Sequence, residues 1–415
     1  MNDILASKED VMTDTRLAGA DFVRALACLM VVGHHVAQRV DPNAFADDQI
    51  WMPMAVTMGA FGVAAFFVLS GYLLARPFWH ALDANQPMPS LRTYTIRRAA
   101  RIVPGLWLAL TVTFVLSFTI LKFPLDGILV LRYLSGMFLV SGFSWLTWFP
   151  VEFNGPLWSI GAELISYAAL PICLMLLFRL PFRAWSARFV WLVIIAAVVG
   201  LQFLALRFLQ PDEYMRGWQH GTVGGAKFWW PNYSPFSFYA IFAVGALAAG
   251  VQVKVAKLRS GWFDLLALAG LALAIGTLAF SFPVADAYGL ANIPYGYPWF
   301  PLGIAVILIA VPSSAALYRV TEIAPIAYVA RVSFGVYVWH YFLMEVVRVL
   351  WQPRYVYWGM INVGAWAWIS FAVVVLSFFI ATLSYALLEE PIIRWARGLE
   401  RRPVPNAPTL SPAAG

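Results

Sequence analysis

The chain has 415 residues, of which 61% are apolar and 12% are charged, and its mean hydropathy is +0.74. Soluble domains carry about a quarter charged residues, so this composition excludes a soluble globular protein. The 28 basic and 21 acidic residues give a net charge of +7. In a membrane protein such charge marks cytoplasmic loops, so we expect no nucleic-acid partner. The prediction is one large all-α, polytopic integral membrane domain.

Ten apolar stretches are long enough to cross a bilayer, which takes about 20 residues per helix. Residues 1–16 are acidic and lack a basic n-region and a cleavage site, so we expect a cytoplasmic segment and not a signal peptide. Residues 17–397 form the predicted membrane domain, and residues 398–415, rich in proline and small residues, form a predicted disordered cytoplasmic tail. The ten predicted spans are residues 20–40, 51–75, 102–121, 157–178, 189–206, 236–253, 265–285, 287–318, 332–350 and 355–388.

Arginines gather in the loops before residue 102 and after residue 178, which places both loops on the cytoplasmic side. An even number of spans must separate these loops, so we expect residues 124–142, which contain Arg132, to lie outside the membrane or to re-enter it. The other basic clusters then fall on the same side. Both termini are therefore predicted to be cytoplasmic, and the longest outer loop is predicted at residues 210–235.

The first span, with the sequence ADFVRALACLMVVGHHV, carries Arg24 and His35. Their spacing of eleven residues is about 1100° of helix, within about 20° of three full turns, so they share one face about 16 Å apart. Asp21, one turn before Arg24, is placed to hold its guanidinium. His34 points about 100° away from His35.

Titratable side chains within a span are costly, so each is a candidate functional group, with structural pairing as the alternative. A cation at the cytoplasmic mouth and an imidazole in the outer half of the membrane suit a long donor that has phosphates at one end and a reactive group at the other. Acyl-coenzyme A has this shape. Arginine is suited to the phosphates, and histidine is suited to general-base or nucleophilic work at the thioester.

Further candidates lie in the span at residues 51–75 and just before the span at residues 102–121. In FFVLSGYL, Ser70 and the following glycine favour a close helix contact over a nucleophilic serine, because no nucleophile-elbow motif surrounds it. In RRAARIVP, Arg98 and Arg101 face one way and can join Arg24 in a basic funnel for an anionic donor. The alternative is ordinary positive-inside charge.

The stretch PLWSIGAELISY opens the span at residues 157–178 and carries Trp158, Glu163 and Tyr167. Glu163 lies about 9 Å into its helix, and His35 lies a comparable distance from the outer end of its own helix. The two can therefore meet at one depth, where a carboxylate would orient the imidazole. The alternative is that Glu163 merely bonds Tyr167, one turn on.

Two late motifs complete the candidates. SFGVYVWH carries Trp339 and His340, and His340 either lines the same cavity or is a structural histidine bonded to a nearby carbonyl. SYALLEEP carries Glu389 at the inner membrane boundary, where it can neutralise nearby arginines. The two cysteines lie in apolar stretches, and no His, Asp and Glu set has metal-ligand spacing, so we expect no metal and no disulfide framework.

Taken together, these segments resemble the membrane-bound acyltransferase-3 family, which includes bacterial O-antigen and exopolysaccharide O-acetyltransferases and macrolide acyltransferases. The resemblance runs in order from about residue 17 to residue 395. It rests on the arginine-ten-residues-histidine pattern in DFVRALACLMVVGHH and on FFVLSGYL, RRAARIVP, PLWSIGAELISY, SFGVYVWHYFL and SYALLEEPIIRW.

The resemblance implies that an acyl group, which we expect to be acetyl, passes from cytoplasmic acyl-CoA to a hydroxyl on the outer side of a bacterial cytoplasmic membrane. It implies that His35 is catalytic, that Arg24, Arg98 and Arg101 face the coenzyme, and that Glu163, Trp339 and Glu389 are supporting residues of the pore. Family members with a fused extracytoplasmic hydrolase-like domain are known, and we expect none here. On the residue patterns and the resemblance together, the candidate catalytic residues are His35 and Glu163. The candidate supporting residues are Asp21, Ser70, Trp158, Tyr167, Trp339, His340 and Glu389.

Several alternatives stay open. His35 acts either as a base for direct attack or as an acyl carrier. The expected acceptor is a carbohydrate or lipid-linked glycan, with a separate extracytoplasmic transferase as a possible partner besides membrane lipids; a macrolide-like small molecule is the nearest alternative. A proton-coupled transporter or flippase is the rival from another class, and it predicts inverted repeats that the sequence does not show.

Overall fold

The computed structural model describes residues 18–181, 185–209, 226–282 and 287–400. The predicted segment 1–16, most of the predicted outer loop 210–235 and residues 401–415 of the predicted tail lie outside the described residues. Residues 398–400 belong to the last helix and not to the tail. Within the described ranges the regular structure is helical, and the strand-like pairing is a single isolated bridge between Val40 and Met360.

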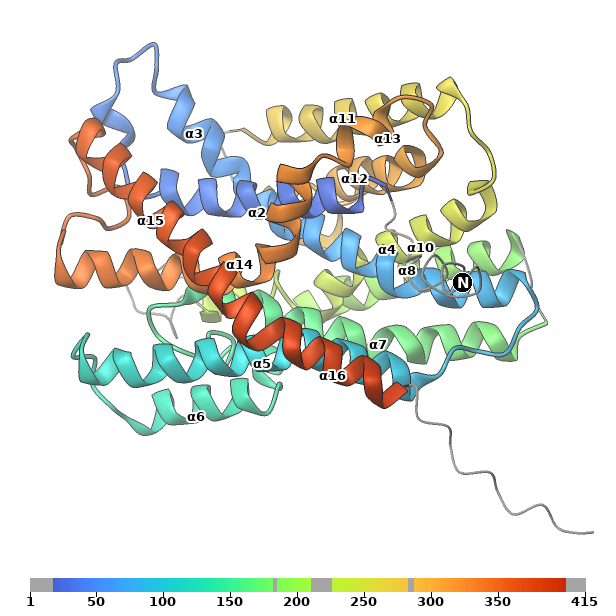
Figure 1. Cartoon of the computed structure of the whole chain (residues 1–415), viewed down its shortest axis with the longest axis horizontal. Coiled ribbons are helices and arrows are strands. Elements are labelled where there is room, and N and C mark those ends of the chain that lie inside the picture. Colours follow the sequence, from blue (N-terminus) through green and yellow to red (C-terminus); the bar gives the residue numbers. More distant parts are fainter. Residues whose placement is uncertain (1–17, 182–184, 210–225, 283–286, 401–415) are drawn as a thin grey trace, which may run out of the picture.

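The helices run side by side along the long axis of the molecule (Figure 1). Eight stretches are long and apolar enough to cross a membrane, which confirms the all-α, polytopic membrane prediction. The main helices are α2 (Ala20–Ala37), α3 (Trp51–Thr57), α4 (Gly62–Asp83), α5 (Leu91–Thr119), α6 (Gly127–Met137), α7 (Trp158–Arg179), α8 (Trp185–Phe208), α10 (Pro235–Val255), α11 (Gly261–Ser281), α12 (Trp299–Ala310), α13 (Leu317–Thr321), α14 (Ala324–Leu350), α15 (Val363–Ser384) and α16 (Glu390–Glu400).

Two further helices, α12 and α14, belong to the same bundle and overlap the two remaining predicted spans, residues 287–318 and 332–350. With 12 residues, α12 is by itself too short to cross a bilayer. The helix α12 is short, and α14 carries charged residues at both of its ends. The helices α4 and α10 form the centre, because most of their surface is buried, whereas α8, α11 and α15 are mostly exposed and form the periphery. An exposed apolar periphery is the surface that lipid covers in a membrane protein.

The stretch at residues 124–142 forms α6, a helix of 11 residues that packs on α5 (Figure 1). Such a helix is about 16 Å long, half of what a bilayer requires, so it does not cross. The buried guanidinium of Arg132 fastens α6 to the following loop: it donates to the carbonyl oxygens of Phe149, at 2.6 Å, and Val151, at 3.2 Å, and pairs with Glu152.

The central helices touch backbone to backbone at glycines. A Cβ on Gly71 of α4 would lie 2.0 Å from the Phe242 oxygen, and one on Gly245 of α10 would lie 1.8 Å from the Val68 oxygen. The close contact predicted for FFVLSGYL is therefore made with α10. Gly71 faces that contact, which leaves the preceding Ser70 on another face of α4, towards a cavity.

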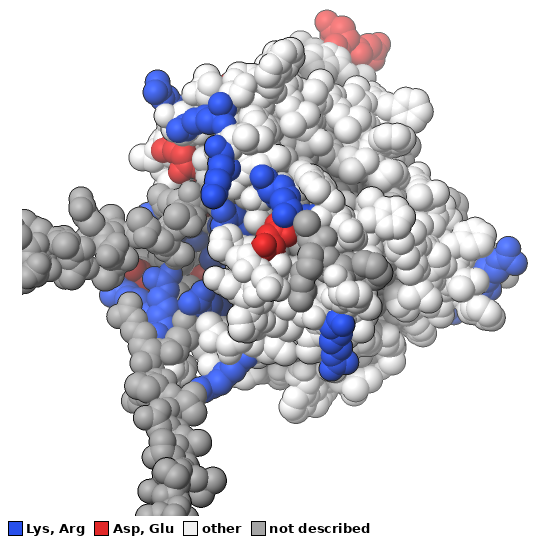
Figure 2. All heavy atoms as spheres, turned by 90° about the vertical axis from the view of Figure 1, so that its right-hand side faces the viewer, with Lys and Arg blue, Asp and Glu red and all other residues white. Residues whose placement is uncertain are grey.

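A buried ion pair joins the ends of two helices, and a partly exposed lysine approaches it. Arg188 of α8 donates to both carboxylate oxygens of Asp83 at the end of α4, each at 2.6 Å, and Lys254 approaches the same carboxylate at 3.3 Å. Figure 2 views the molecule from the right-hand end of Figure 1, where blue lysine and arginine side chains outnumber red acidic ones. This distribution agrees with the predicted cytoplasmic side.

Candidate active site

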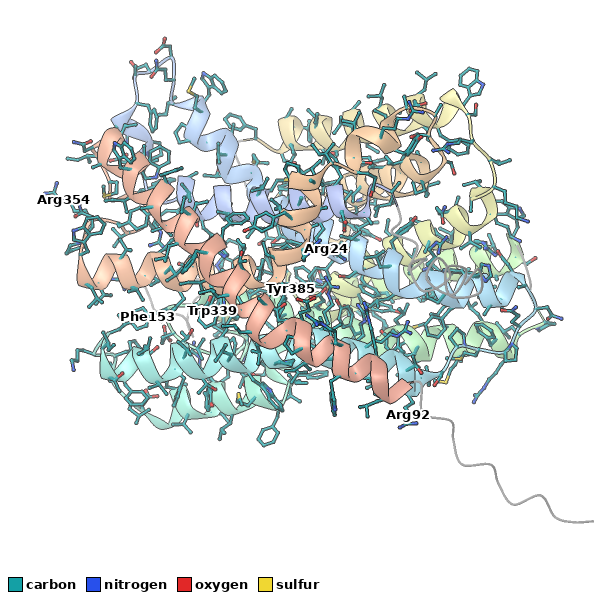
Figure 3. The ribbon with its side chains drawn as sticks, viewed as in Figure 1. Arg24, Arg92, Phe153, Trp339, Arg354 and Tyr385 are labelled. Carbon is teal, nitrogen blue, oxygen red and sulfur yellow. The ribbon has the colours of Figure 1, made fainter. Side chains whose placement is uncertain are left out.

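The helix α2 carries Arg24 and His35, and the structure places them in different surroundings. Figure 3 shows Arg24 near the middle of the molecule, with Arg354 at the left-hand end and Arg92 at the lower edge, right of centre. Its Nη1 is 3.6 Å from the carboxylate of Asp21, the partner that the spacing predicts. Arg24 therefore faces a cavity in the interior and not the membrane surface.

That cavity has a volume of about 90 Å³ and brings Arg24 of α2 together with Arg98 and Arg101 of α5. Three cations around one small space attract an anion, because their mutual repulsion is relieved when negative charge enters. We call this space the arginine cavity. Its other lining residues are Val63, Phe66, Phe67, Ser70, Leu73, Leu74, Ile102, Ser159, Ile160, Glu163, Tyr167, Ser333, Phe334 and Tyr337.

Glu163 supplies the carboxylate of the arginine cavity. Its Oε1 accepts hydrogen bonds from Ser70 Oγ, at 2.6 Å, and from Tyr167 Oη, at 2.5 Å. The predicted pairing of Glu163 with His35 is therefore wrong, and the alternative bond to Tyr167 is the one observed. Ser70, placed by sequence at a helix contact alone, is also a hydrogen-bond donor in this cavity.

The reason for the displaced Glu163 is the loop that precedes α7, which folds back into the bundle. Asn154 in this loop is fully buried and donates from Nδ2 to the Val338 carbonyl oxygen at 2.9 Å. Ser159 and Tyr337 share a hydrogen bond of 2.6 Å between their hydroxyls. The helix α7 thus begins deep inside, beside α14, and Glu163 lies further along the axis than a surface start would place it.

His35 meets His340 of α14. His35 Nδ1 is 3.0 Å from His340 Nε2, and His340 Nδ1 is 2.9 Å from the Val336 carbonyl oxygen. A carbonyl oxygen only accepts, so in the neutral pair His340 carries its proton on Nδ1 and accepts at Nε2. His35 then donates from Nδ1, and its Nε2 keeps a free lone pair.

His340 is thus bonded to a nearby carbonyl, as the structural interpretation predicts, and it does not line the arginine cavity. It also contacts His35. The adjacent His34 is turned away, and its Nδ1 donates to the Thr57 carbonyl oxygen at 2.5 Å. The ring of Tyr341 packs edge-on against His35, with centroids 5.0 Å apart. His35 therefore sits between imidazole and phenol rings supplied by α14.

A buried ion pair that sequence analysis missed closes the end of α2 beyond His35. Arg39 donates to Glu345 at 2.8 Å and to the Tyr355 carbonyl oxygen at 3.0 Å. The backbone of Met360 donates to the Arg39 carbonyl oxygen at 3.0 Å, which ties the loop after α14 to the end of α2. Arg39 lies four residues after His35, a helical spacing that could have suggested a connected role.

Glu389 is buried in a single π-helical turn, η8 (Tyr385–Glu389), between α15 and α16. Pro391 has no N–H for the usual bond to the carbonyl one turn back, so the helix widens there. Ser384 Oγ donates to Glu389 Oε1 at 3.4 Å, and Arg101 is a neighbouring cation. The expected neutralisation of arginines by Glu389 fits this placement.

The remaining candidates, Trp339 and Trp158, do not line the arginine cavity. Trp339 is buried, and its indole N–H has no hydrogen-bond partner. Trp158 packs in an aromatic cluster, with ring centroids 4.8 Å from Trp148 and 5.3 Å from Tyr233. Among the residues that the structure describes, no group of three His, Cys, Asp or Glu side chains has the arrangement of a metal site.

Comparison with protein families gives one match that covers most of the chain. A family described as "Acyltransferase domain" matches residues 17–386, which include every candidate residue except Glu389. The chain belongs to the acyltransferase-3 family. It is an integral membrane O-acyltransferase, and this assignment decides against the transporter alternative.

Three relatives show the range of the similarity. "Acyltransferase MdmB" from Streptomyces mycarofaciens is 26% identical over 414 residues, which is 95% of each chain. "O-acetyltransferase OatA" from Staphylococcus aureus is 23% identical over 400 residues, covering 92% of this chain and 58% of the relative. "Peptidoglycan O-acetyltransferase OatA" from Listeria monocytogenes is 25% identical over 391 residues, covering 90% and 55%. The chain therefore spans little more than half of the OatA proteins.

Proposed function

We propose that this O-acyltransferase takes an acetyl group from acyl-CoA on the cytoplasmic side of a bacterial cytoplasmic membrane and transfers it to a hydroxyl of a cell-surface or secreted glycan. The observation that carries this proposal is that α2 holds an arginine and a histidine at two separate positions along its length. Arg24 faces a cavity with two further arginines, and His35 lies eleven residues on with its Nδ1 3.0 Å from His340 Nε2, a contact that leaves Nε2 of His35 as the basic nitrogen when the pair is neutral. The glycan acceptor is favoured by the OatA relatives, whose names include a peptidoglycan O-acetyltransferase.

The arginines bind the coenzyme in this proposal. Arginine suits phosphate oxygens because its planar guanidinium donates two parallel hydrogen bonds. Glu163 shares the same cavity, and its bonds from Ser70 and Tyr167 hold the carboxylate in place. The carboxylate is thereby a fixed negative charge near Arg98.

Two routes use the lone pair of His35 Nε2. In the direct route Nε2 takes the proton of the acceptor hydroxyl while the hydroxyl oxygen attacks the thioester carbonyl carbon. A C–O bond forms and the C–S bond breaks. The coenzyme thiolate then takes the proton from the imidazolium. In the covalent route Nε2 attacks the carbonyl carbon and the thiolate leaves. The acceptor oxygen then displaces the imidazole, and the hydroxyl proton ends on the thiolate.

The test uses full-length protein in nanodiscs with radiolabelled acetyl-CoA and chitopentaose as the glycan probe. We expect label on chitopentaose together with release of coenzyme A. Label that stays on the protein when the probe is left out indicates the covalent route, and its absence indicates direct attack. Absence of any transfer and of any coenzyme A release would contradict the proposal.

A second version of the assay offers erythromycin as the acceptor. The reason is that the relative that matches this chain over 95% of both lengths is named only as an acyltransferase, a name that gives no acceptor. Transfer to erythromycin and not to chitopentaose would replace the glycan with a small-molecule acceptor. Addition of a separate extracytoplasmic transferase domain to the chitopentaose arm tests whether a partner completes the transfer.

Arginine variants test the donor site. Arg98→Gln removes a charge-assisted hydrogen bond to an anion, so we expect the KM for acetyl-CoA to rise by about 10- to 100-fold, from about 1.5–3 kcal/mol of lost binding. Arg92→Gln is the matched control, because Arg92 is an exposed arginine at the start of the same helix. An equal KM for acetyl-CoA in both variants would show that Arg98 does not bind the donor.

A further inference from the structure

The arginine cavity stops short of His35. Its lining includes Phe66 of α4 and Tyr337 of α14 but neither His35 nor His340. The ring of Tyr337 lies between the two sites, with its centroid 5.9 Å from that of Phe66 and 6.0 Å from that of His340. Two aromatic rings therefore form the wall between the cavity and the histidine pair.

The same wall lies on the face of α2 that joins Arg24 to His35. Phe66 packs against a buried cluster that contains Cys28 and Val32. These residues follow Arg24 by four and eight positions, so they continue its helix face toward His35. Phe66 thus covers the stretch of α2 that an acyl group must pass on its way from the arginines to the imidazole.

No room for passage remains between α2 and α4 one turn away. A Cβ on Gly62 of α4 would lie 2.6 Å from the Ala27 carbonyl oxygen, and one on Gly59 would lie 2.0 Å from the Met30 carbonyl oxygen. Backbones in contact leave no space for a chain of methylenes. The way to His35 runs past Phe66 and Tyr337.

The two rings differ in how firmly they are held. Tyr337 donates to the Pro156 carbonyl oxygen at 3.1 Å and shares a 2.6 Å hydrogen bond with Ser159. Phe66 has only van der Waals contacts to hold it, and its side chain is half-buried. A rotation of Phe66 alone therefore opens the wall without breaking a hydrogen bond.

We propose that Phe66 is the gate between the arginine cavity and His35, and that with Tyr337 it limits the transferred acyl group to a short one. This inference rests on the proposed function, since it concerns the acyl group of the same donor. A ring that swings aside by one rotamer admits a two-carbon group. A longer chain would have to keep the ring displaced from its packing against Cys28 and Val32 throughout the reaction.

The test compares cleavage of acetyl-CoA and hexanoyl-CoA by full-length protein in nanodiscs, followed by coenzyme A release. In Phe66→Ala we expect the ratio of hexanoyl-CoA to acetyl-CoA turnover to rise by about tenfold or more. A hydrophobic pocket discriminates by about this factor for a single methylene, and hexanoyl is longer than acetyl by more than one. Phe67→Ala removes the same volume from the same cavity but from a ring packed on Phe238. We expect Phe67→Ala to keep the wild-type ratio, and an equal ratio in all three proteins would overturn the inference.

A second readout does not depend on turnover. In a Cys173→Ser background Cys28 is the only cysteine, and it is buried in the cluster against which Phe66 packs. We expect N-ethylmaleimide to label Cys28 faster in Phe66→Ala than in the parent or in Phe67→Ala, with Phe66→Leu in between. Equal labelling rates would overturn the gate even if the enzyme is active. If no acyl-CoA is cleaved by the wild type while labelling still rises, the proposed function fails and the closure by Phe66 stands.

Discussion

The hydrogen bond between His35 and His340 makes a quantitative prediction. His340→Leu keeps an apolar side chain of similar size in α14 but removes the acceptor for His35 Nδ1–H, which lies 3.0 Å away. A buried donor left without a partner costs about 1–3 kcal/mol, and if this cost falls on the reacting orientation of His35, kcat drops by about 5- to 150-fold. His340→Gln supplies an amide oxygen that can accept the same proton, so its kcat is expected to stay closer to wild type.

The assay is steady-state release of coenzyme A from acetyl-CoA by protein in nanodiscs. His340 does not line the arginine cavity, so the KM for acetyl-CoA is expected to stay at its wild-type value in both variants while kcat falls. Circular dichroism and thermal unfolding check that each variant is folded. The reasoning is refuted if His340→Leu keeps the wild-type kcat, or if His340→Gln loses as much as His340→Leu.

Two further predictions concern stability. Gly245→Ala would place its Cβ 1.8 Å from the Val68 backbone oxygen, so we expect little folded protein in fluorescence-detected gel filtration. Gly200→Ala, whose Cβ meets nothing within 4 Å, is the control and is expected to gain about 0.5–1 kcal/mol of stability; loss of folding in both would contradict the packing argument. Asp83→Ala leaves the buried guanidinium of Arg188 without its carboxylate and is expected to destabilise by about 3–5 kcal/mol, seen as a lower Tm. Adding Arg188→Met should recover most of that loss, and an unchanged Tm in Asp83→Ala would show that the pair is dispensable.

Much of the fold was predictable because it follows from patterns among residues that are close together in the sequence. Apolar stretches of membrane length placed the helices, and the eleven-residue spacing within α2 is a property of one regular helix. The same holds for Arg98 and Arg101, which α5 turns towards the cavity. The π-helical turn at Glu389 also had a local signal, because Pro391 follows the glutamate pair within a helix.

The predicted contact of Glu163 with His35 is wrong because the position of Glu163 depends on residues far away in the sequence. Its position depends on the loop before α7, which is drawn into the bundle by Asn154 through a bond to Val338, 184 residues away. A count along α7 that starts at the membrane surface cannot include this displacement.

Helical periodicity could not identify the partner of His35 either. His340 lies 305 residues further along the chain, and the Arg39–Glu345 pair joins the same two helices. Such pairs become visible only once α2 and α14 are packed together. What the sequence did offer was the presence of two titratable side chains within apolar spans, a combination that calls for a partner.

The most direct test of the catalytic role of His35 is the rate of acetyl-CoA cleavage in His35→Ala beside His34→Asn. Both changes fall at the same end of α2, but His34 is turned away and bonded to the Thr57 carbonyl oxygen, an acceptor that an asparagine amide can still serve. We predict that His35→Ala loses acetyl-CoA cleavage and transfer while His34→Asn keeps both. Wild-type cleavage in a folded His35→Ala protein would contradict the mechanism.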